Sequence, residues 1–171
     1  MNDECLECLN ETRKVFPSLK NKKISSDYKK MKSKKLGYVT AKIPRRLDFD
    51  PEALLLGHPT QIKNKISKPN DFKIFINFDL QRINNVALRK QILQHILIHE
   101  LLHITNEDLI TISKDYKRRK KKKIHVNDFE DEVFKRFNQL RRLNCIMEIQ
   151  KREHLDIAIK KILDSINWFR K

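Results

Sequence analysis

The chain has 171 residues, of which 38 are Lys or Arg and 22 are Asp or Glu, so its formal net charge at pH 7 is +16. This length predicts one domain, or one domain with a helical extension, and 39% hydrophobic residues are enough to build a core. The basic excess points to a polyanionic partner, although a lysine-rich surface also serves solubility alone.

Several classes of protein are disfavoured by composition. Two glycines and no Gly-x-Gly-x-x-Gly pattern argue against a nucleotide-binding fold, and three cysteines without a repeated spacing argue against a secreted disulfide framework. Residues 1–11 are acidic and polar, unlike a secretory signal, and no apolar run approaches the roughly 20 residues that span a bilayer. We expect a soluble protein in the cytoplasm or at the nucleoid, without membrane contact.

The hydrophobic pattern predicts the elements in chain order. A first helix runs from Asp3 to about Phe16, where Pro17 ends it, and residues 20–35 are lysine-rich and weakly patterned. The run Tyr38–Ile43 predicts a strand, alone or in a hairpin, and residues 48–70 predict a connection with a short strand or helical turn. Phe72–Phe78 is the strongest strand, and Val86–Ile104 predicts a largely buried helix. Helical patterns then extend from Asn127 through Leu143 and from Ile146 to Trp168.

One segment of the predicted central helix carries a chemical motif. Residues 96–104 have the sequence Ile-Leu-Ile-His-Glu-Leu-Leu-His-Ile, which contains His-Glu-x-x-His. Positions i and i+4 share a helix face, so His99 and His103 can direct two imidazoles at one Zn²⁺ ion, with Glu100 about 100° around the helix. Such a zinc ion lowers the pKa of water towards about 7, and Glu100 would act as general base. Polar residues in so apolar a helix would be costly to bury without a shared purpose.

The third metal ligand must come from another part of the chain. His95 continues the spacing, but residues at i, i+4 and i+8 climb about 12 Å, too far for one ion to take all three. His125 is the favoured candidate. A carboxylate from Glu130 or Glu132 is the alternative, which would give a site of two histidines and one glutamate.

These motifs resemble the SprT-like zinc metalloproteases, the family of the Spartan DNA–protein crosslink proteases, within the zincin superfamily. The matching pieces are the strand Lys73–Asn77, the helix with His99–His103, the polar run Ile104–Asp108 and the run His125–Phe129. The resemblance covers roughly residues 36–137. It implies a peptidase acting on proteins at or near DNA, with His125 as third ligand and Phe129 packed on the following helix. The minigluzincins are a rival resemblance, in which a glutamate such as Glu130 or Glu132 replaces His125.

A polybasic tract lies between the metal helix and the candidate third ligand. Its residues are Lys117, Arg118, Arg119, Lys120, Lys121, Lys122 and Lys123. We expect an exposed loop over residues 114–123 that either binds phosphates, bringing a DNA-bound substrate to the zinc, or is solvated without a partner. Cys5 and Cys8 form a lone Cys-x-x-Cys pair, for which core positions in the first helix are expected.

The sequence therefore predicts a single α+β, zincin-like domain over residues 1–171, with a small, mostly antiparallel sheet packed on the metal helix. Residues 1–19 form an N-terminal helix, 20–140 the catalytic core and 141–171 a helical extension. The predicted activity is that of a zinc metalloendopeptidase, with one Zn²⁺ per chain and a protein or peptide substrate. The cleft is expected between sheet and metal helix, where the strand Phe72–Phe78 could pair with a peptide as an edge strand. The alternatives are a nucleic-acid-binding protein with a structural or vestigial zinc site, and a latent, minigluzincin-like peptidase.

Overall fold

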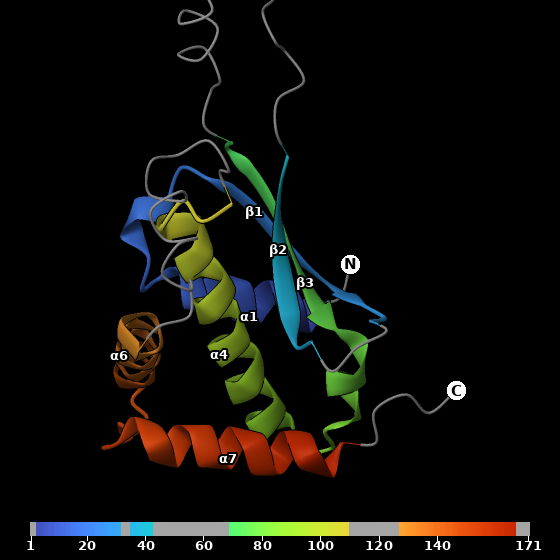
Figure 1. Cartoon of the computed structure of the whole chain (residues 1–171), viewed down its shortest axis with the longest axis vertical. Coiled ribbons are helices and arrows are strands. Elements are labelled where there is room, and N and C mark those ends of the chain that lie inside the picture. Colours follow the sequence, from blue (N-terminus) through green and yellow to red (C-terminus); the bar gives the residue numbers. More distant parts are fainter. Residues whose placement is uncertain (1–2, 32–34, 43–68, 110–126, 167–171) are drawn as a thin grey trace, which may run out of the picture.

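The computed structural model describes residues 3–31, 35–42, 69–109 and 127–166. This part of the chain is a mixed α+β structure in which a three-stranded sheet packs against helices (Figure 1). Its elements are α1 (Asp3–Arg13), the 3₁₀ helix η1 (Pro17–Leu19), β1 (Lys23–Lys29), β2 (Gly37–Lys42), β3 (Asp71–Asn77), the 3₁₀ helix η2 (Phe78–Arg82), α4 (Val86–Thr105), α6 (Asn127–Leu143) and α7 (Arg152–Ser165). The α+β class, the first helix, the two predicted strands, the central helix and the helix from Asn127 are confirmed.

The strand order is β1-β3-β2, so β3 lies in the centre of the sheet. β3 pairs in parallel with β1 and antiparallel with β2, which makes the sheet mixed where a mostly antiparallel one was expected. The expectation that Phe72–Phe78 is an edge strand is wrong, because β3 is paired on both sides. Strand order depends on pairing between distant segments, which local pattern does not encode. β2, next to α4, and β1 are the edges.

β1 is a strand that the sequence pattern did not reveal. Its inward positions carry Ile24, Ser26 and Tyr28, so two of its three core-facing side chains are polar. Both are satisfied by α1: the Ser26 hydroxyl donates to the Cys5 carbonyl at 2.9 Å, and the Tyr28 hydroxyl donates to the Glu4 carboxylate at 3.1 Å. Hydrogen bonds to a neighbouring helix thus replace the apolar alternation that normally marks a strand.

α4 is the central helix and is buried along most of its length, as predicted. The Asn85 side chain caps its first turn by accepting from the Leu88 N–H at 3.0 Å. On one side it packs against the inner face of the sheet, and on another against α1. Side chains of α1 fix this contact, since Glu4 accepts from Arg89 at 2.7 Å and Glu11 accepts from Lys90 at 2.7 Å. α4 is therefore tied to α1 as well as packed on the sheet.

The two C-terminal helices complete the described structure. α6 packs on α4 through its apolar face, which contains Phe129, Val133, Phe137 and Leu140. α7 lies across the N-terminal end of α4 (Figure 1). The predicted final helix begins later than expected, at Arg152. The segment before it is held instead by Asn138, whose side chain exchanges hydrogen bonds with the backbone of Ile149.

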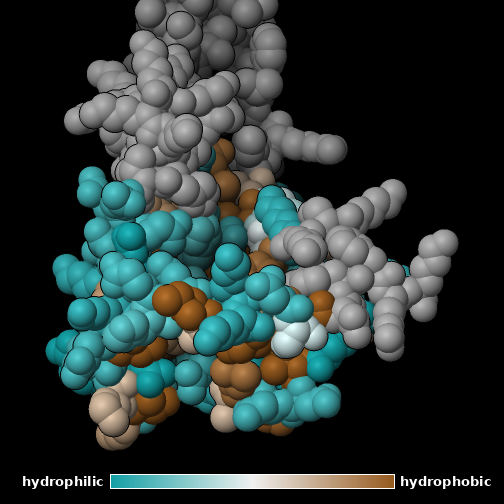
Figure 2. Space-filling view, turned by 60° about the horizontal axis from the view of Figure 1, so that its bottom comes forward, coloured by the Kyte–Doolittle hydropathy of each residue, from teal (hydrophilic) through white to brown (hydrophobic). Residues whose placement is uncertain are grey.

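The surface around α7 is mostly hydrophilic, with separate hydrophobic patches (Figure 2). Cys5 and Cys8 are buried core residues of α1, as predicted, and burial raises their thiol pKa values to about 12 and about 11. Over the described ranges, no helix is long and apolar enough to cross a membrane. The connection predicted over residues 48–70 falls outside the described part, apart from its last two residues.

Candidate metal centre

His99 and His103 lie one turn apart on α4, and their rings approach each other in the way the motif requires. The ring centroids are 5.0 Å apart and the rings are inclined at 74°. Phe129 of α6 contacts both imidazoles, with centroid distances of 5.0 Å to His99 and 4.8 Å to His103. The buried phenyl ring therefore restricts the orientation of both histidines from the side opposite the sheet, and it brings the beginning of α6 to the imidazoles.

The turn that ends α4 positions a further carboxylate. Glu107 adopts a left-handed conformation with φ 56, its N–H donates to the Ile104 carbonyl, and the Asp108 N–H donates to the His103 carbonyl at 3.0 Å. This is the hydrogen-bond pattern of a Schellman motif, in which glycine usually occupies the left-handed position. The turn brings Asp108 back alongside the last turn of the helix.

Asp108 holds the second histidine. Its Oδ2 lies 3.1 Å from His103 Nδ1, and only 3% of its side chain is exposed. A hydrogen bond at Nδ1 fixes the imidazole tautomer and leaves Nε2 as the nitrogen available to a metal ion. Asp108 lies in the polar run after the motif, but its contact with His103 could not be predicted from the sequence, because it depends on the backbone turn at Glu107.

Glu100 is buried between α4 and β2, with 7% of its surface exposed. Burial raises the pKa of its carboxyl group, while the charges of His103 and Lys35 and a backbone hydrogen bond from Val39 act in the opposite direction. Its carboxylate is thus stabilised by three partners in an otherwise apolar place.

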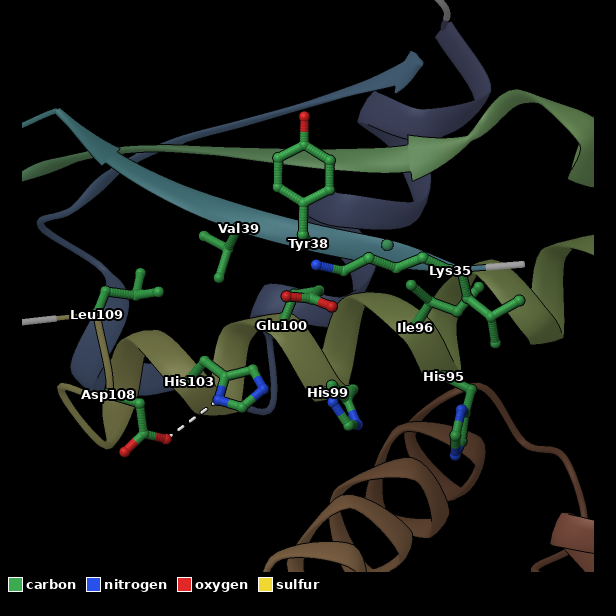
Figure 3. Close-up of a pocket in the computed structure, with 12 residues that line it drawn as sticks. Lys35, Tyr38, Val39, His95, Ile96, His99, Glu100, His103, Asp108 and Leu109 are labelled. Atoms are coloured by element: carbon green, nitrogen blue, oxygen red, sulfur yellow. Dashed lines mark hydrogen bonds and ion pairs between the residues drawn. The ribbon is translucent and has the colours of Figure 1, made fainter. Parts of the chain in front are cut away.

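A cleft of about 450 Å³ lies between β2 and α4. It is lined by residues of the segment before β2, of β2 itself and of α4, namely Lys35, Leu36, Gly37, Tyr38, Val39, His95, Ile96, His99, Glu100 and His103, and beyond α4 by Asp108 and Leu109. Glu100 and Ile96 project towards the strand, whereas His95 and His99 project on the side of α6 (Figure 3). A cleft thus lies where one was predicted, between the sheet and the helix that carries the His-Glu-x-x-His motif.

Gly37 allows the close approach of β2 to α4. A Cβ atom at this position would lie 2.8 Å from Ile96 Cγ2, 3.2 Å from the Phe75 carbonyl oxygen and 3.5 Å from Glu100 Oε1. The first distance is shorter than real Cβ contacts allow. The only glycine of the described part thus sets the width of the cleft beside Glu100.

His95 lines the same cleft one turn before His99. Its ring packs edge-on against Phe137 with a centroid distance of 5.6 Å, and burial lowers its pKa to about 4. A neutral imidazole packed on a core phenyl ring is a structural residue. The interpretation of His95 as a residue flanking the metal pair agrees with this packing.

Of the candidates for the third ligand, the structure describes Glu130 and Glu132 but not His125. His125 and the polybasic tract from Lys117 to Lys123 lie outside the described residues. On α6, Glu132 accepts a hydrogen bond from Arg136 Nε at 2.7 Å, and Glu130 is partly buried in the first turn. Within the described ranges, no group of three or more His, Cys, Asp or Glu side chains is arranged to hold a metal ion. The described structure brings together His99, His103, Glu100 and Asp108.

Comparisons with protein-family models, with curated proteins and with solved structures each found no match.

Proposed function

We propose that this chain is a zinc-dependent metallopeptidase of zincin-like architecture. The observation that carries the proposal is the pair of imidazoles, His99 and His103, with the buried Asp108 at Nδ1 of the second and Glu100 in the same cleft. The donor set fits zinc, because neutral imidazole is a preferred ligand and a ligating histidine characteristically donates its other N–H to a carboxylate. Bound zinc would polarise a substrate carbonyl and lower the pKa of a water molecule.

The residues of the chain have separate roles in this reaction. His99 and His103 would hold the ion, and Asp108 would keep His103 in the tautomer that exposes Nε2. Glu100 would accept a proton from the attacking water and return it to the leaving amine. His125 remains the first candidate for the third ligand, since it precedes α6 by two residues and α6 contacts both imidazoles through Phe129. Glu130 or Glu132, both on α6, is the alternative.

The edge strand β2 supplies a binding site for an extended peptide. The Asn77 N–H donates to the Leu36 carbonyl at 2.8 Å, so backbone groups of even-numbered positions face β3 and those of Gly37, Val39 and Ala41 face away from it. The Val39 N–H is bonded to Glu100, which confirms this alternation. A peptide in the cleft could add to this edge as a further strand, with its backbone beside Glu100.

Zinc content and proteolysis, measured on the same set of variants, test the proposal. Wild-type protein should bind about one zinc ion per chain and cleave an unfolded substrate such as labelled casein. Glu100→Gln should keep the zinc and lose cleavage, whereas His99→Ala and His103→Ala should lose both. His154→Ala, which removes an exposed imidazole of α7, is the matched control and should behave as wild type. Cleavage by Glu100→Gln at the wild-type rate, or no zinc uptake by the wild type, would refute the proposal.

The third ligand is identified by the same assay with three further variants. Loss of zinc in His125→Ala but not in Glu130→Ala or Glu132→Ala supports the three-histidine site, and loss only in one of the two glutamate variants supports the site with a glutamate. Proteins crosslinked to DNA are the substrate class to compare with free casein, since the proposed activity towards DNA-associated proteins rests on the family resemblance and the basic charge.

A further inference from the structure

The face of the sheet that points away from the helices has an unusual composition. In the register of the sheet, Tyr38 on β2 lies directly opposite Phe75 on β3, and both occupy outward positions. Their ring centroids are 5.1 Å apart and their planes are inclined at 35°. Outward positions of a half-exposed sheet normally carry polar residues. Two adjacent aromatic rings in such positions form a flat apolar surface that no helix of the described part covers.

Lysines surround these two rings. Lys29 Nζ donates a hydrogen bond to the Tyr38 hydroxyl at 2.8 Å and lies 4.8 Å from the Phe75 centroid. Lys35 Nζ lies 4.9 Å from the Tyr38 centroid, and Lys73 Nζ lies 5.1 Å from the Phe75 centroid. Each ammonium group is attracted by the electron-rich face of a ring, and each side chain remains long and mobile enough to reach another partner. We call these five residues the aromatic–lysine platform.

The net charge of this face is positive. Asp27 is the acidic neighbour of the platform, and it pairs with Lys73 at 3.5 Å with 45% of its side chain exposed. Such an exposed ion pair contributes little to stability, so Lys73 can readily leave Asp27 for another anion. Lys23 and Lys42 continue the face at the other end of the sheet, beside Asp71. Lysine therefore outnumbers aspartate around the aromatic pair, and the complementary ligand is an anion with flat rings.

We infer that the aromatic–lysine platform binds single-stranded nucleic acid. Bases would stack on Tyr38 and Phe75, and the ammonium groups of Lys29, Lys35 and Lys73 would move from the ring faces to the phosphates. This division of labour, with aromatic side chains for bases and a basic surface for the backbone, is the general physical basis of single-strand binding. A duplex keeps its bases stacked inside and can use only the lysines. An acidic peptide can also use only the lysines.

The platform adjoins the candidate metal centre. Lys35 and Tyr38 line the cleft as well, the ring of Tyr38 points away from α4, and the Lys35 side chain extends along β2 towards Glu100 (Figure 3). A strand bound on the platform would pass along the edge of β2, next to the cleft. Tyr38, Phe75, Lys29 and Lys73 are placed by the sheet and by one another, so nucleic-acid binding on the platform requires neither zinc nor proteolysis; only Lys35 also acts on Glu100.

Photocrosslinking of the unaltered chain provides the first test. A 20-nucleotide single strand containing 5-iodouracil is bound and irradiated, and the modified peptides are identified by mass spectrometry. Crosslinks at Tyr38 or Phe75 are expected, since this base reacts with the aromatic side chain on which it is stacked. Crosslinks confined to other regions of the chain, or no binding of the strand, would overturn the inference.

Binding measured by fluorescence anisotropy separates the two parts of the platform. The full chain with residues 117–123 replaced by Ser and Gly serves as background, so that the polybasic tract does not hide the platform. Phe75→Leu keeps an apolar side chain and should weaken binding at least about fivefold with little change in salt dependence. Lys29→Gln combined with Lys73→Gln should lower the slope of log K against log salt by about 1.4. Lys135→Gln, a lysine of α6 with 78% of its side chain exposed, is the matched control and should change affinity less than about twofold.

Two competitors identify the kind of ligand. A duplex of the same sequence and a polyglutamate of equal charge should both bind more weakly than the single strand, and neither should respond to Phe75→Leu. Equal affinity for polyglutamate would instead assign the surface to acidic peptides and overturn the inference. A Phe75→Leu protein that binds the single strand like the background protein would also overturn it. Circular dichroism melting of each variant confirms that the fold is retained.

Discussion

Removal of the Asp108 carboxylate should weaken zinc binding without preventing it. Asp108 Oδ2 accepts a hydrogen bond from His103 Nδ1 at 3.1 Å in a place where only 3% of the side chain is exposed, so water does not easily replace it. Loss of a hydrogen-bond partner of a ligating histidine costs about 10- to 100-fold in metal affinity. For Asp108→Ala we expect about 30-fold, which corresponds to about 2 kcal/mol. Asp108→Asn keeps a neutral acceptor and should lose about half of that free energy.

The assay is a competition titration in which a fluorescent chelator and the protein share a limited amount of zinc. The matched control is Asp79→Ala, which removes another buried carboxylate, at η2, whose partner is Arg82 at 3.2 Å. Its zinc affinity should equal that of the wild type. Zinc affinity within twofold of wild type in Asp108→Ala would refute the argument. An equal loss in Asp79→Ala would assign the effect to the fold in general.

Three further perturbations have effects of known sign. Burial lowers the pKa of His95 to about 4, below its unfolded value of 6.5, so its contribution to stability is present above pH 6.5 and is lost as the pH falls towards 4. Urea unfolding should therefore give a free energy of unfolding at most about 2 kcal/mol lower at pH 5 than at pH 7.5. His95→Gln should lack this pH-dependent part of the stability. Gly37→Ala places a Cβ 2.8 Å from Ile96 Cγ2 and should lower the free energy of unfolding by about 1–3 kcal/mol. Its substrate affinity should fall more than its zinc affinity. An unchanged urea midpoint of unfolding would contradict the close packing. Glu107→Gly should leave the midpoint of thermal unfolding unchanged or raise it, since glycine relieves a left-handed residue at about 1 kcal/mol.

The parts of the fold that the sequence predicted are those set by local pattern. α4 could be predicted because its apolar residues continue over most of Val86–Thr105 and cover more than one face, and β3 because it is rich in aromatic and β-branched residues. Both signals come from the local sequence of the element itself. The pair His99 and His103 could be predicted for the same reason, since i and i+4 share a helix face wherever the helix is placed.

The parts that were missed depend on contacts between distant segments. β1 buries polar side chains, and only the hydrogen bonds from Ser26 and Tyr28 to α1 make this favourable. β3 was expected at the edge of the sheet but lies in its centre, and β2 is an edge strand. The hydrophobic pattern of a single strand does not determine the strand order. Asp108 reaches His103 through a left-handed glutamate where a glycine would have signalled the turn.

Apart from Lys35, the residues of the aromatic–lysine platform belong to strands, but the strand pattern alone does not show that they share the outer face of the sheet. In β3 the alternation places Phe72, Ile74 and Ile76 on one face and Lys73 and Phe75 on the other. An aromatic residue favours a strand whichever face it occupies, so the strand can be predicted correctly while the face of the Phe75 ring stays undetermined. Once the inner face is known, an aromatic residue at an outward position requires an explanation, and its pairing with Tyr38 beneath lysine ammonium groups provides one. Three lysines of the basic excess are thereby placed on the outer face of the sheet, next to the cleft, in addition to the polybasic tract that the sequence shows.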